Sequence, residues 1–380
     1  MTRNFDFAAS DLMSPGINVL FDGQWGSTGK GKLSAFLAYY SDCVWNTADF
    51  QPNAGHTVVI DGGEYVTKSI PSGYVNLDAK LFLTAGATIN PDVFMREVEM
   101  LDPVFGIRNR LWIHPHAGVV FPEDIAEEQE MMGSIASTMT GGGAALRRKV
   151  ARKALLAKDV PALQPYVKDC TFEILQAARA GARVLSETAQ GFDLSLNHGW
   201  QYPYTTSRDV TPASTLNNLG APPQLLARSW ASMRTMPIRV GHFYDPETGE
   251  KIGDSGPFYP DQQELSWDEV HGIAGTDKDL TELTTVTKRV RRIFTWSRQQ
   301  YSRMLQICQP TDIFMNFANY LDDSITGATG QISDFPGASF PKVDAFCDEI
   351  NQQAVNVLGN AAPSISLIGT GADNEEMLWV

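Results

Sequence analysis

Gly23 to Lys32 read GQWGSTGKGK, a glycine-rich stretch with two lysines. It follows the apolar run Ile17–Phe21 and precedes the apolar run Leu33–Leu37, so it lies between a predicted buried strand and a predicted helix. Backbone N–H groups of such a turn, together with the N-terminus of the helix, stabilise anionic oxygens, and Lys30 adds a positive charge. The stretch therefore predicts a loop that binds phosphate groups, with a purely structural glycine turn as the alternative.

This loop departs from the common P-loop motif. Five residues separate Gly23 from Gly29 where that motif has four, and a glycine follows Lys30 where it has Ser or Thr. Two neutral hydroxyls, Ser27 and Thr28, stand in the middle, with no acid between the glycines. The loop is therefore a phosphate loop of another kind.

Apolar runs that predict buried strands alternate with helical stretches along the chain. This alternation predicts an α/β fold with a mainly parallel central sheet and helices on both faces. We expect a single large domain over residues 15–380, long functional loops at about 186–224 and 241–292, and a loose N-terminal extension over residues 1–14. The predicted strands are Ile17–Phe21, Leu81–Thr84, Arg183–Leu185, Ile238–Val240, Ile313–Phe317 and Ile365–Ile368, with a hairpin of His56–Ile60 and Tyr65–Ser69; the predicted helices are Pro91–Leu101, Thr171–Ala180, Trp296–Cys308 and Pro341–Ala354.

The composition argues against several classes of protein. A net charge of −14 disfavours a protein that grips nucleic acid, because binding to its phosphate backbone needs a basic excess. The four cysteines are far apart with no CxxC pair, which indicates reduced thiols and no zinc site. The sequence shows neither a signal peptide nor an apolar stretch long enough to span a bilayer, so we expect a cytoplasmic protein without a membrane partner.

Further short motifs follow the loop. Asn53–Thr57 reads NAGHT, and Lys149–Arg152 reads KVAR. With the loop, this ordered set resembles the adenylosuccinate synthetase family, and the resemblance also implies that family's fold. The other matching motifs are Ile70–Gly73 (IPSG), Ala189–Gly191 (AQG), Tyr202–Tyr204 (YPY), Val286–Arg292 (VTKRVRR) and Gly369–Gly371 (GTG).

Members of that family join L-aspartate to C6 of a purine nucleotide. A nucleoside triphosphate phosphorylates O6 of the bound monophosphate, and the aspartate nitrogen then displaces phosphate, a reaction that depends on positioning and electrostatics. The resemblance implies that Lys30 steadies the transferring phosphoryl group and that His56 protonates or hydrogen-bonds the oxygen at which charge develops. Outside the NAGHT motif, His56 would be interpreted as an ordinary loop histidine. The resemblance also implies a Mg²⁺ site at the Gly55 carbonyl and at the position of Ser27.

Three binding sites and a homodimer follow from the resemblance, with Arg152 reaching the monophosphate site of the neighbouring subunit. Alternatively, Arg152 belongs to a basic helical face exposed to solvent. Paired arginines suit a dicarboxylate such as aspartate. The implied monophosphate site is Ser27, Asn53, Thr138, Arg152, Gln190, Thr211 and Arg289; the aspartate site is Val286, Thr287, Arg289 and Arg291; the triphosphate site is Gly26, Thr28, Gly29, Lys30, Gly31, Lys32, Gly55, His56, Thr57, Arg291, Asn319, Gly369, Thr370 and Gly371.

Two neighbouring positions depart from the family's pattern. The family has aspartate at the position of Ser27 and glutamate at that of Thr28. A serine hydroxyl is a poor base, so one interpretation is an inactive nucleotide-binding regulator. The other is that serine leaves room for an exocyclic amine at the C2 edge of the purine and accepts a hydrogen bond from it, which predicts a guanine nucleotide as substrate.

A phage subgroup of the family carries this serine and converts dGMP to 2-amino-2′-deoxyadenylosuccinate, for DNA in which diaminopurine replaces adenine. We therefore expect a ligase that acts on dGMP, with the ordinary reaction of inosinate (IMP) and GTP as an alternative. A further departure is Asn319, at the position of an aspartate that reads the guanine of GTP. Asparagine pairs with adenine, so ATP or dATP is the expected phosphoryl donor unless Asn319 is merely a turn residue.

Overall fold

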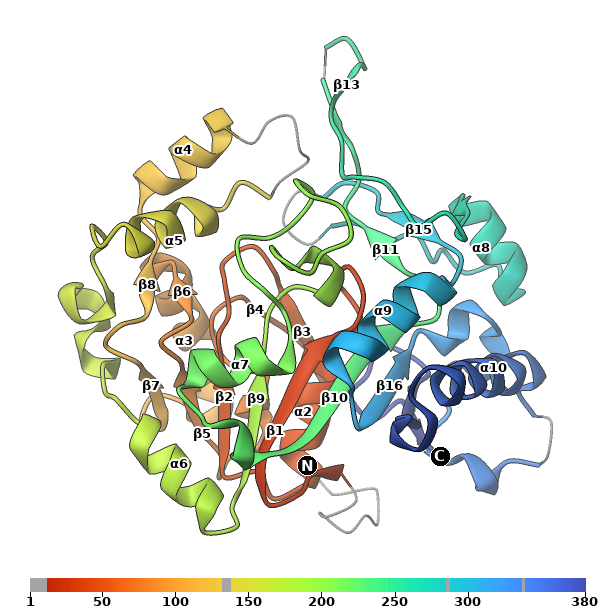
Figure 1. Cartoon of the computed structure of the whole chain (residues 1–380), viewed down its shortest axis with the longest axis horizontal. Coiled ribbons are helices and arrows are strands. Elements are labelled where there is room, and N and C mark those ends of the chain that lie inside the picture. The colour runs from red at the N-terminus through yellow and green to blue at the C-terminus, as the bar shows by residue number, and fades with distance from the viewer. Residues whose placement is uncertain (1–11, 132–137, 246, 285–287, 337–338) are drawn as a thin grey trace.

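The computed structural model describes residues 12–131, 138–245, 247–284, 288–336 and 339–380. A ten-stranded sheet runs through the centre of the molecule, with β1 between β10 and β9 (Figure 1). Its neighbouring strands pair in parallel except β18 and β19, which confirms the predicted mainly parallel sheet. In spatial order the strands are β17 (Gly330–Gln331), β19 (Met377–Trp379), β18 (Ser364–Gly369), β16 (Asp312–Asn316), β10 (Leu226–Arg234), β1 (Gly16–Asp22), β9 (Arg183–Glu187), β2 (Trp45–Ala48), β5 (Lys80–Leu83) and β7 (Leu111–Ile113).

Helices cover both faces of the sheet, as predicted, because side chains along each strand point alternately to the two faces. Ile17 and Val19 of β1 pack with α6 and α7, whereas Leu20 packs with α2. The helices are α2 (Lys30–Tyr40), α3 (Pro91–Phe105), α4 (Pro122–Met131), α5 (Gly142–Val150), α6 (Thr171–Arg179), α7 (Pro212–Leu219), α8 (Trp267–Ala274), α9 (Arg298–Cys308) and α10 (Pro341–Leu358).

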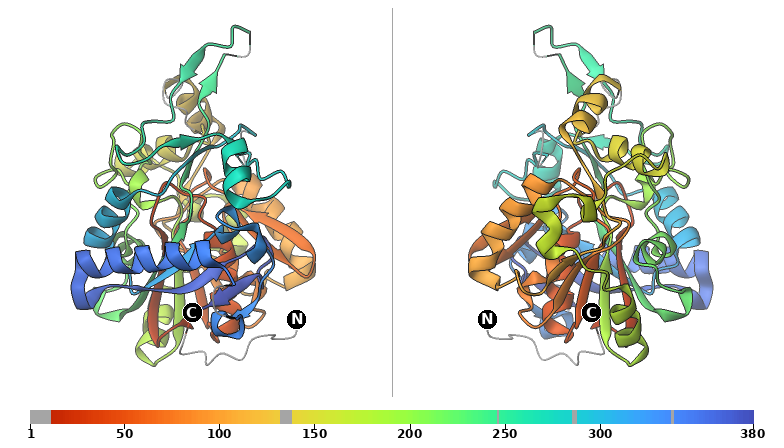
Figure 2. Two further views of the ribbon diagram at one scale, coloured as in Figure 1. Left: turned by 90° about the vertical axis from the view of Figure 1, so that its right-hand side faces the viewer. Right: turned by 90° about the vertical axis from the view of Figure 1, so that its left-hand side faces the viewer.

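Shorter strands build small sheets outside the central one. The predicted hairpin is confirmed as β3 (His56–Ile60) and β4 (Gly63–Thr67). A second hairpin, β12 (Phe243–Tyr244) and β13 (Lys251–Gly253), stands out from the rest of the molecule (Figure 2). The remaining short strands are β6 (Thr88–Ile89) with β8 (Gly118–Val119), and β11 (Ile238–Arg239) with β15 (Arg292–Phe294) and β14 (Glu264–Leu265).

Three predictions need correction. The strand predicted near Ile238 belongs to a separate antiparallel sheet, and the two predicted loops contain the helices α7 and α8. The end of the predicted loose extension is packed: Leu12 and Met13 are buried. Trp230 Nε1 donates to the Leu12 carbonyl at 3.1 Å, so the ordered domain begins before residue 15.

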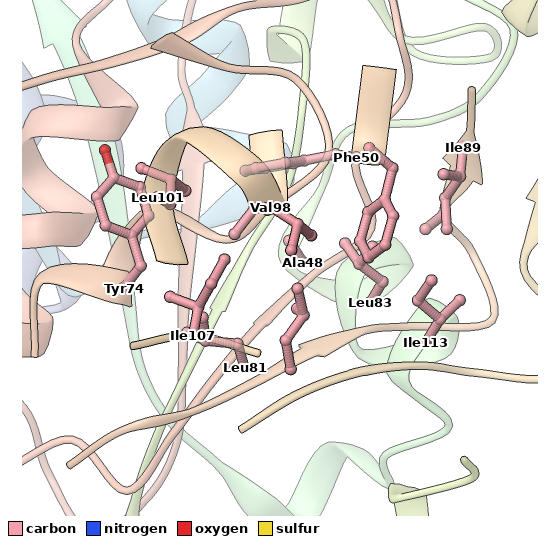
Figure 3. Close-up of a cluster of buried hydrophobic side chains, with 14 of the residues drawn as sticks. Ala48, Phe50, Tyr74, Leu81, Leu83, Ile89, Val98, Leu101, Ile107 and Ile113 are labelled. Carbon is pink, nitrogen blue, oxygen red and sulfur yellow. The ribbon is translucent and has the colours of Figure 1, made fainter. Parts of the chain in front are cut away.

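A buried apolar cluster fixes the β2 and β5 half of the sheet beneath α3 (Figure 3). Val98 and Leu101 of α3 pack with Leu81 and Leu83 of β5, and Phe50 extends the cluster toward the end of β2. This packing holds the segment that follows β2, which carries the NAGHT motif. Within the described ranges, no helix is long and apolar enough to cross a membrane.

Candidate active site

The phosphate loop leaves β1 and enters α2 at one edge of the sheet. Because β1, β10, β16 and β18 run parallel, their carboxyl ends meet at this edge, where α/β folds bind ligands. Gly29 caps α2 with a φ of 91°, and a Cβ on it would lie 2.1 Å from Asn316 Nδ2. Glycine is therefore needed for the backbone conformation and for the close approach to β16.

A pocket opens over this loop and gathers most of the predicted site residues. Its lining comes from the loop, the NAGHT segment, the AQG turn and the segment that ends at Arg291. The predicted residues that line it are Gly26, Ser27, Thr28, Gly29, Lys30, Gly31, Asn53, Gly55, His56, Thr57, Thr138, Gln190 and Arg291.

Lys30 is the first residue of α2 and is almost wholly buried. Its Nζ donates to the Gln190 carbonyl at 2.9 Å and lies 3.3 Å from a carboxylate oxygen of Asp22. An ammonium group has three N–H bonds, so these two partners leave one for a ligand in the pocket. The charge is thus held in place before any phosphate arrives.

The His56 side chain is buried at the pocket wall and stacks on Phe50, with ring centroids 3.8 Å apart. Burial, reinforced by the charge of Lys30, holds the pKa of His56 well below its usual value. Its Nε2 has no hydrogen-bond partner among the described residues. The site therefore presents a neutral imidazole with a nitrogen available to a ligand.

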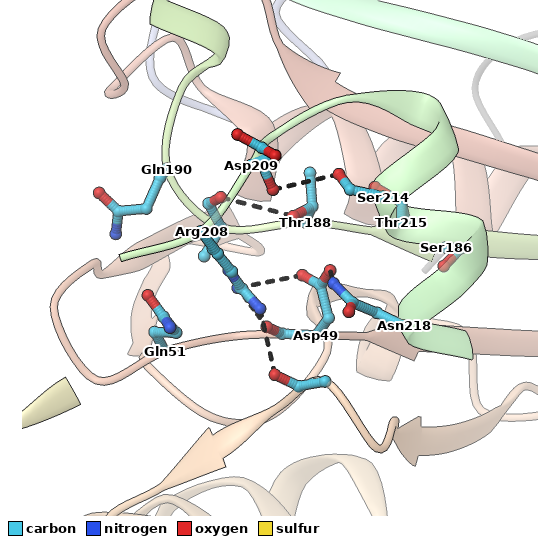
Figure 4. Close-up of polar contacts among 12 residues, drawn as sticks. Asp49, Gln51, Ser186, Thr188, Gln190, Arg208, Asp209, Ser214, Thr215 and Asn218 are labelled. Atoms are coloured by element: carbon cyan, nitrogen blue, oxygen red, sulfur yellow. Dashed lines mark hydrogen bonds and ion pairs between the residues drawn. The ribbon is translucent and has the colours of Figure 1, made fainter. Parts of the chain in front are cut away.

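A polar network at the end of β2 lies near Gln190 (Figure 4). Gln190 Nε2 donates to Asn53 Oδ1 at 2.7 Å. In the network, Arg208 pairs with the Asp49 carboxylate, with Nη2 and Oδ1 3.2 Å apart, and Asn218 Nδ2 donates to the other carboxylate oxygen at 2.6 Å. The network ties the end of β2 to α7 and so fixes the segment that presents Asn53.

Arg291 reaches the pocket but already has a partner. Its Nε lies 3.6 Å from Glu282 Oε2, and Glu282 also pairs with the fully buried Arg234 and accepts a hydrogen bond from Tyr320 at 2.9 Å. Burial alone would raise the pKa of Glu282, but the two arginines hold it below its usual value. Val286 lies outside the described residues, as does its predicted neighbour Thr287.

Comparison with known proteins shows which family this protein belongs to. The family model described as adenylosuccinate synthetase matches residues 19–162 and 157–326. The chain belongs to the adenylosuccinate synthetase family. The enzymes of this family are carbon–nitrogen ligases, and this chain is one of them.

Relatives from phages and from archaea are similar over most of their length. The N6-succino-2-amino-2′-deoxyadenylate synthase of Vibrio phage phiVC8 is 38% identical, covering 80% of this chain and 86% of its own. The adenylosuccinate synthetase of Archaeoglobus fulgidus is 31% identical, covering 96% and 98%.

Solved structures share the fold. Succinoaminodeoxyadenylate synthetase (PurZ) of cyanophage S-2L, bound to dGMP and dATP, superposes with a TM-score of 0.77 at 31% identity, covering 96% of this chain and 95% of that one. The adenylosuccinate synthetase of Plasmodium falciparum has the same TM-score at 16% identity and supports the fold alone.

Several residues that the family resemblance implied do not line the pocket. Lys32 Nζ instead donates to the carbonyl oxygens of Gly371 and Glu376, both at 2.7 Å, and burial lowers its pKa to about 7. Arg289 stacks over Phe243, 4.0 Å from the ring centroid, beside a second hollow. The others outside the lining are Arg152, exposed after α5; Thr211, the N-cap of α7; Asn319, half-buried after β16; and Gly369, Thr370 and Gly371 at the end of β18.

Other residues line the pocket that the sequence did not single out as site residues. Trp25 lies in the loop itself, and the guanidinium of Arg239 stacks 4.8 Å from its ring centroid. Burial, and then the neighbouring Arg292, lowers the pKa of Arg239 to about 10. An arginine within the apolar run around Ile238 was the available signal, since a buried charge needs a purpose or a partner. Glu282 offered no comparable signal.

Proposed function

We propose that this protein joins L-aspartate to C6 of dGMP with ATP or dATP as phosphoryl donor. The products are 2-amino-2′-deoxyadenylosuccinate, the nucleoside diphosphate and phosphate. The observation that carries this proposal is Ser27, a hydroxyl in the pocket at the position of the family's acid. Phage relatives named as synthases of this product, and the structure bound to dGMP and dATP, support it.

Ser27 selects the substrate through the hydrogen bond that its hydroxyl accepts from the purine base. A carboxylate at this position would receive the N1–H of inosinate, whereas a small hydroxyl leaves space at the C2 edge and accepts a hydrogen bond from an exocyclic amine. Ser27 is exposed in the open pocket, and a bound base that lacks the NH group would cover its hydroxyl and leave it unpaired, so such an analogue is disfavoured. IMP lacks the 2-amino group, so the pocket favours the guanine base.

The reaction begins with transfer of the γ-phosphoryl group to O6 of dGMP, and the N1 proton leaves through Ser27, water or a phosphate oxygen. Lys30 and the backbone N–H groups of the loop stabilise the phosphoryl oxygens, and neutral His56 donates a hydrogen bond where negative charge develops. The aspartate nitrogen then attacks C6, the C6–O bond breaks and phosphate leaves. Arg291, with the predicted Val286 and Thr287, binds the aspartate carboxylates, and the proposed monophosphate site adds Asn53, Thr138, Gln190, Thr211 and Arg289.

Mg²⁺ fits the residues present only as a companion of the triphosphate. Among the described residues, no three His, Cys, Asp or Glu side chains gather to hold an ion. The Ser27 hydroxyl and the Gly55 carbonyl are neutral oxygen donors in the same pocket, which suits a cation that takes most of its ligands from phosphates and water. When bound, Mg²⁺ supplies charge neutralisation of the phosphate oxygens.

The proposal places this enzyme in deoxynucleotide synthesis in the cytoplasm of an infected host. Removal of the succinyl carbons from its product would give the 2-aminoadenine deoxynucleotide of DNA in which diaminopurine replaces adenine. In this setting ATP or dATP is the donor, and Asn319 is the group that reads adenine.

One coupled assay tests the function. The enzyme is supplied with ATP, L-aspartate and Mg²⁺ together with dGMP, GMP or IMP, and phosphate release and the shift in purine absorbance are followed. We expect turnover with dGMP and little with IMP. Turnover with IMP and GTP alone would establish the ordinary reaction instead, and nucleotide binding without any phosphate release would establish an inactive regulator.

A further inference from the structure

The acid that is missing from the middle of the phosphate loop is present directly before it. Asp22 is the last residue of β1, and its side chain is wholly buried at the sheet edge beneath the loop. It does not line the pocket, and both of its carboxylate oxygens accept hydrogen bonds from the chain itself. Its four hydrogen-bonded neighbours all belong to the loop or to the first residue of α2.

Each oxygen of the Asp22 carboxylate serves a different purpose. Oδ1 accepts the backbone N–H groups of Gln24 at 2.8 Å and of Gly26 at 3.2 Å, and so shapes the first turn of the loop. Oδ2 accepts the Thr28 hydroxyl at 2.6 Å and the Lys30 ammonium at 3.3 Å. A buried carboxylate is costly unless it is paired, and these four donors offset that cost.

We propose that Asp22 is a positioning residue for the phosphoryl transfer, acting through Lys30. Asp22, at the end of β1, places a carboxylate next to Thr28. The family has a glutamate at the position of Thr28 itself. Together with the Gln190 carbonyl, Asp22 fixes two N–H bonds of the Lys30 ammonium, so that the third points into the pocket. This inference rests on the role of Lys30 in the proposed function, but not on the identity of the purine.

The substitution Asp22→Asn tests the roles of the two carboxylate oxygens separately. Asparagine keeps a carbonyl oxygen for the N–H groups of Gln24 and Gly26, so the turn is retained, whereas its NH₂ group meets Thr28 and the Lys30 ammonium. We expect kcat to fall by about tenfold to hundredfold, the effect of losing one charge-assisted hydrogen bond. The KM for L-aspartate should change by less than about threefold, because the proposed aspartate site lies on the segment that ends at Arg291 and not on the loop.

A double-mutant cycle tests whether the effect passes through Lys30. Asp22→Asn, Lys30→Ala and the double variant are compared by phosphate release with whichever purine nucleotide the unmodified enzyme accepts. We expect Asp22→Asn to cost almost nothing further once Lys30 is alanine. If turnover of Lys30→Ala is too low to measure, the same cycle is run on the dissociation constant for ATP, with the same expectation.

Asp312→Asn is the matched control, since Asp312 is a buried aspartate at the opposite, amino-terminal end of β16. It should lower the melting temperature without lowering kcat. Multiplicative losses in the cycle, or an Asp22→Asn variant that loses only stability, would overturn the proposal. Failure of the proposed function would appear separately, as a different preferred nucleotide in the unmodified enzyme.

Discussion

Ser27 is held rigidly from behind, which determines what it offers to the pocket. Its φ of 56° lies in the left-handed region, which is uncommon for a residue other than glycine. Its carbonyl accepts a hydrogen bond from Arg234 at 3.2 Å, and the Arg234 guanidinium stacks 3.9 Å from the ring centroid of Phe317. The backbone therefore cannot shift easily to accommodate a larger side chain.

Restoring the family's acid should change the choice of substrate more than the fold. In Ser27→Asp, the carboxylate would crowd the 2-amino edge of dGMP and accept the N1–H of IMP. We expect the ratio of kcat/KM for dGMP to that for IMP to fall at least about tenfold, as a changed hydrogen-bond partner does. Ser27→Ala is the control that removes the acceptor without adding charge. An unchanged ratio in Ser27→Asp would show that another residue selects the purine.

Asn319 carries the prediction for the donor nucleotide. It is half-buried in the short turn after β16 and lies outside the lining of the pocket, and the proposed function assigns it to the base of the donor. Asn319→Asp should weaken the use of ATP and improve that of GTP, because a mismatched buried hydrogen bond costs about 1–3 kcal/mol. The measurement is kcat/KM for both donors at saturating dGMP and aspartate. Equal use of ATP and GTP by the unmodified enzyme would contradict this role.

At the scale of elements, the phosphate loop is clamped between neighbours that leave it no space. A Cβ on Gly191, in the AQG turn, would lie 2.3 Å from the Gln24 carbonyl oxygen and 2.4 Å from the Gly26 nitrogen. On the other side, a Cβ on Gly31 would lie 2.7 Å from the Thr57 carbonyl oxygen. Gly191 and Gly31 are therefore glycines because the backbone of another motif approaches each of them closely.

Gly191→Ala should displace the loop and damage catalysis. A shift of about 1 Å in a catalytic group costs about a hundredfold in rate, so we expect a loss of that order in kcat/KM for dGMP. Gly272→Ala in α8 is the control, since its Cβ would meet no atom within 4 Å. That helical change should stabilise by about 0.5–1 kcal/mol and leave activity intact. Normal activity in Gly191→Ala would show that the loop tolerates the shift.

The elements that the sequence predicted are those whose signals are local. β1 and α3 were predicted because one is an apolar run broken only by Asn18 and the other has Asn90 as a capping residue before a proline. β10 was missed because Leu226–Arg234 mixes arginine and serine with apolar residues, and only its central position in the sheet buries them. α8 has a capping box in Ser266 and Glu269 that could have predicted its start. It was missed because the helix is short and lies within a segment that resembles a loop.

At the scale of the whole molecule, the pocket joins segments that are far apart in the sequence. Motif order alone was enough to predict the loop, His56 and Gln190 as site residues that come together. It could not predict that Arg234 and Glu282 pair behind Ser27, because this contact exists only once β10 lies beside β1. Those residues occupy no motif, and their roles depend on tertiary packing.

Global stability should depend on pH through Glu187 at the end of β9. Burial raises its pKa from 4.5 to about 7 in the folded protein. Between these values the folded state holds more protons than the unfolded state, so the free energy of unfolding falls as the pH rises, by about 3 kcal/mol. Glu187→Gln should remove this contribution to the decrease in the free energy of unfolding. Burial also raises the pKa of Glu97 to about 7, and the contribution of Glu97 should remain in this variant. Urea unfolding from pH 4.5 to 8 measures how the free energy of unfolding depends on pH. Glu173→Gln, at an exposed position, is the control. An unchanged pH dependence in Glu187→Gln would contradict the assignment.

Arg152 bears on the assembly of the molecule. Its side chain is exposed, it follows the end of α5 with a φ of 62°, and it lies outside the lining of the pocket in its own chain. The exposed guanidinium is therefore available to the monophosphate site of a second copy of the chain. We propose a homodimer in which each subunit completes the monophosphate site of the other.

Subunit mixing tests that assembly directly. Arg152→Ala should raise the KM for dGMP by about tenfold to hundredfold, since a charged hydrogen bond to phosphate contributes about 1.5–3 kcal/mol. When it is mixed with Lys30→Ala and allowed to exchange subunits, half of the dimers are mixed, and each mixed dimer has one site with both Lys30 and Arg152 intact. Activity should therefore recover to about a quarter of that of the unmodified enzyme, as expected for an isologous dimer. Arg148→Ala, in α5 just before Arg152, is the control for the loss of basic charge, and it should leave the KM for dGMP nearly unchanged. Proven subunit exchange without recovery would mean that Arg152 acts within its own chain or on its solvent-exposed face alone.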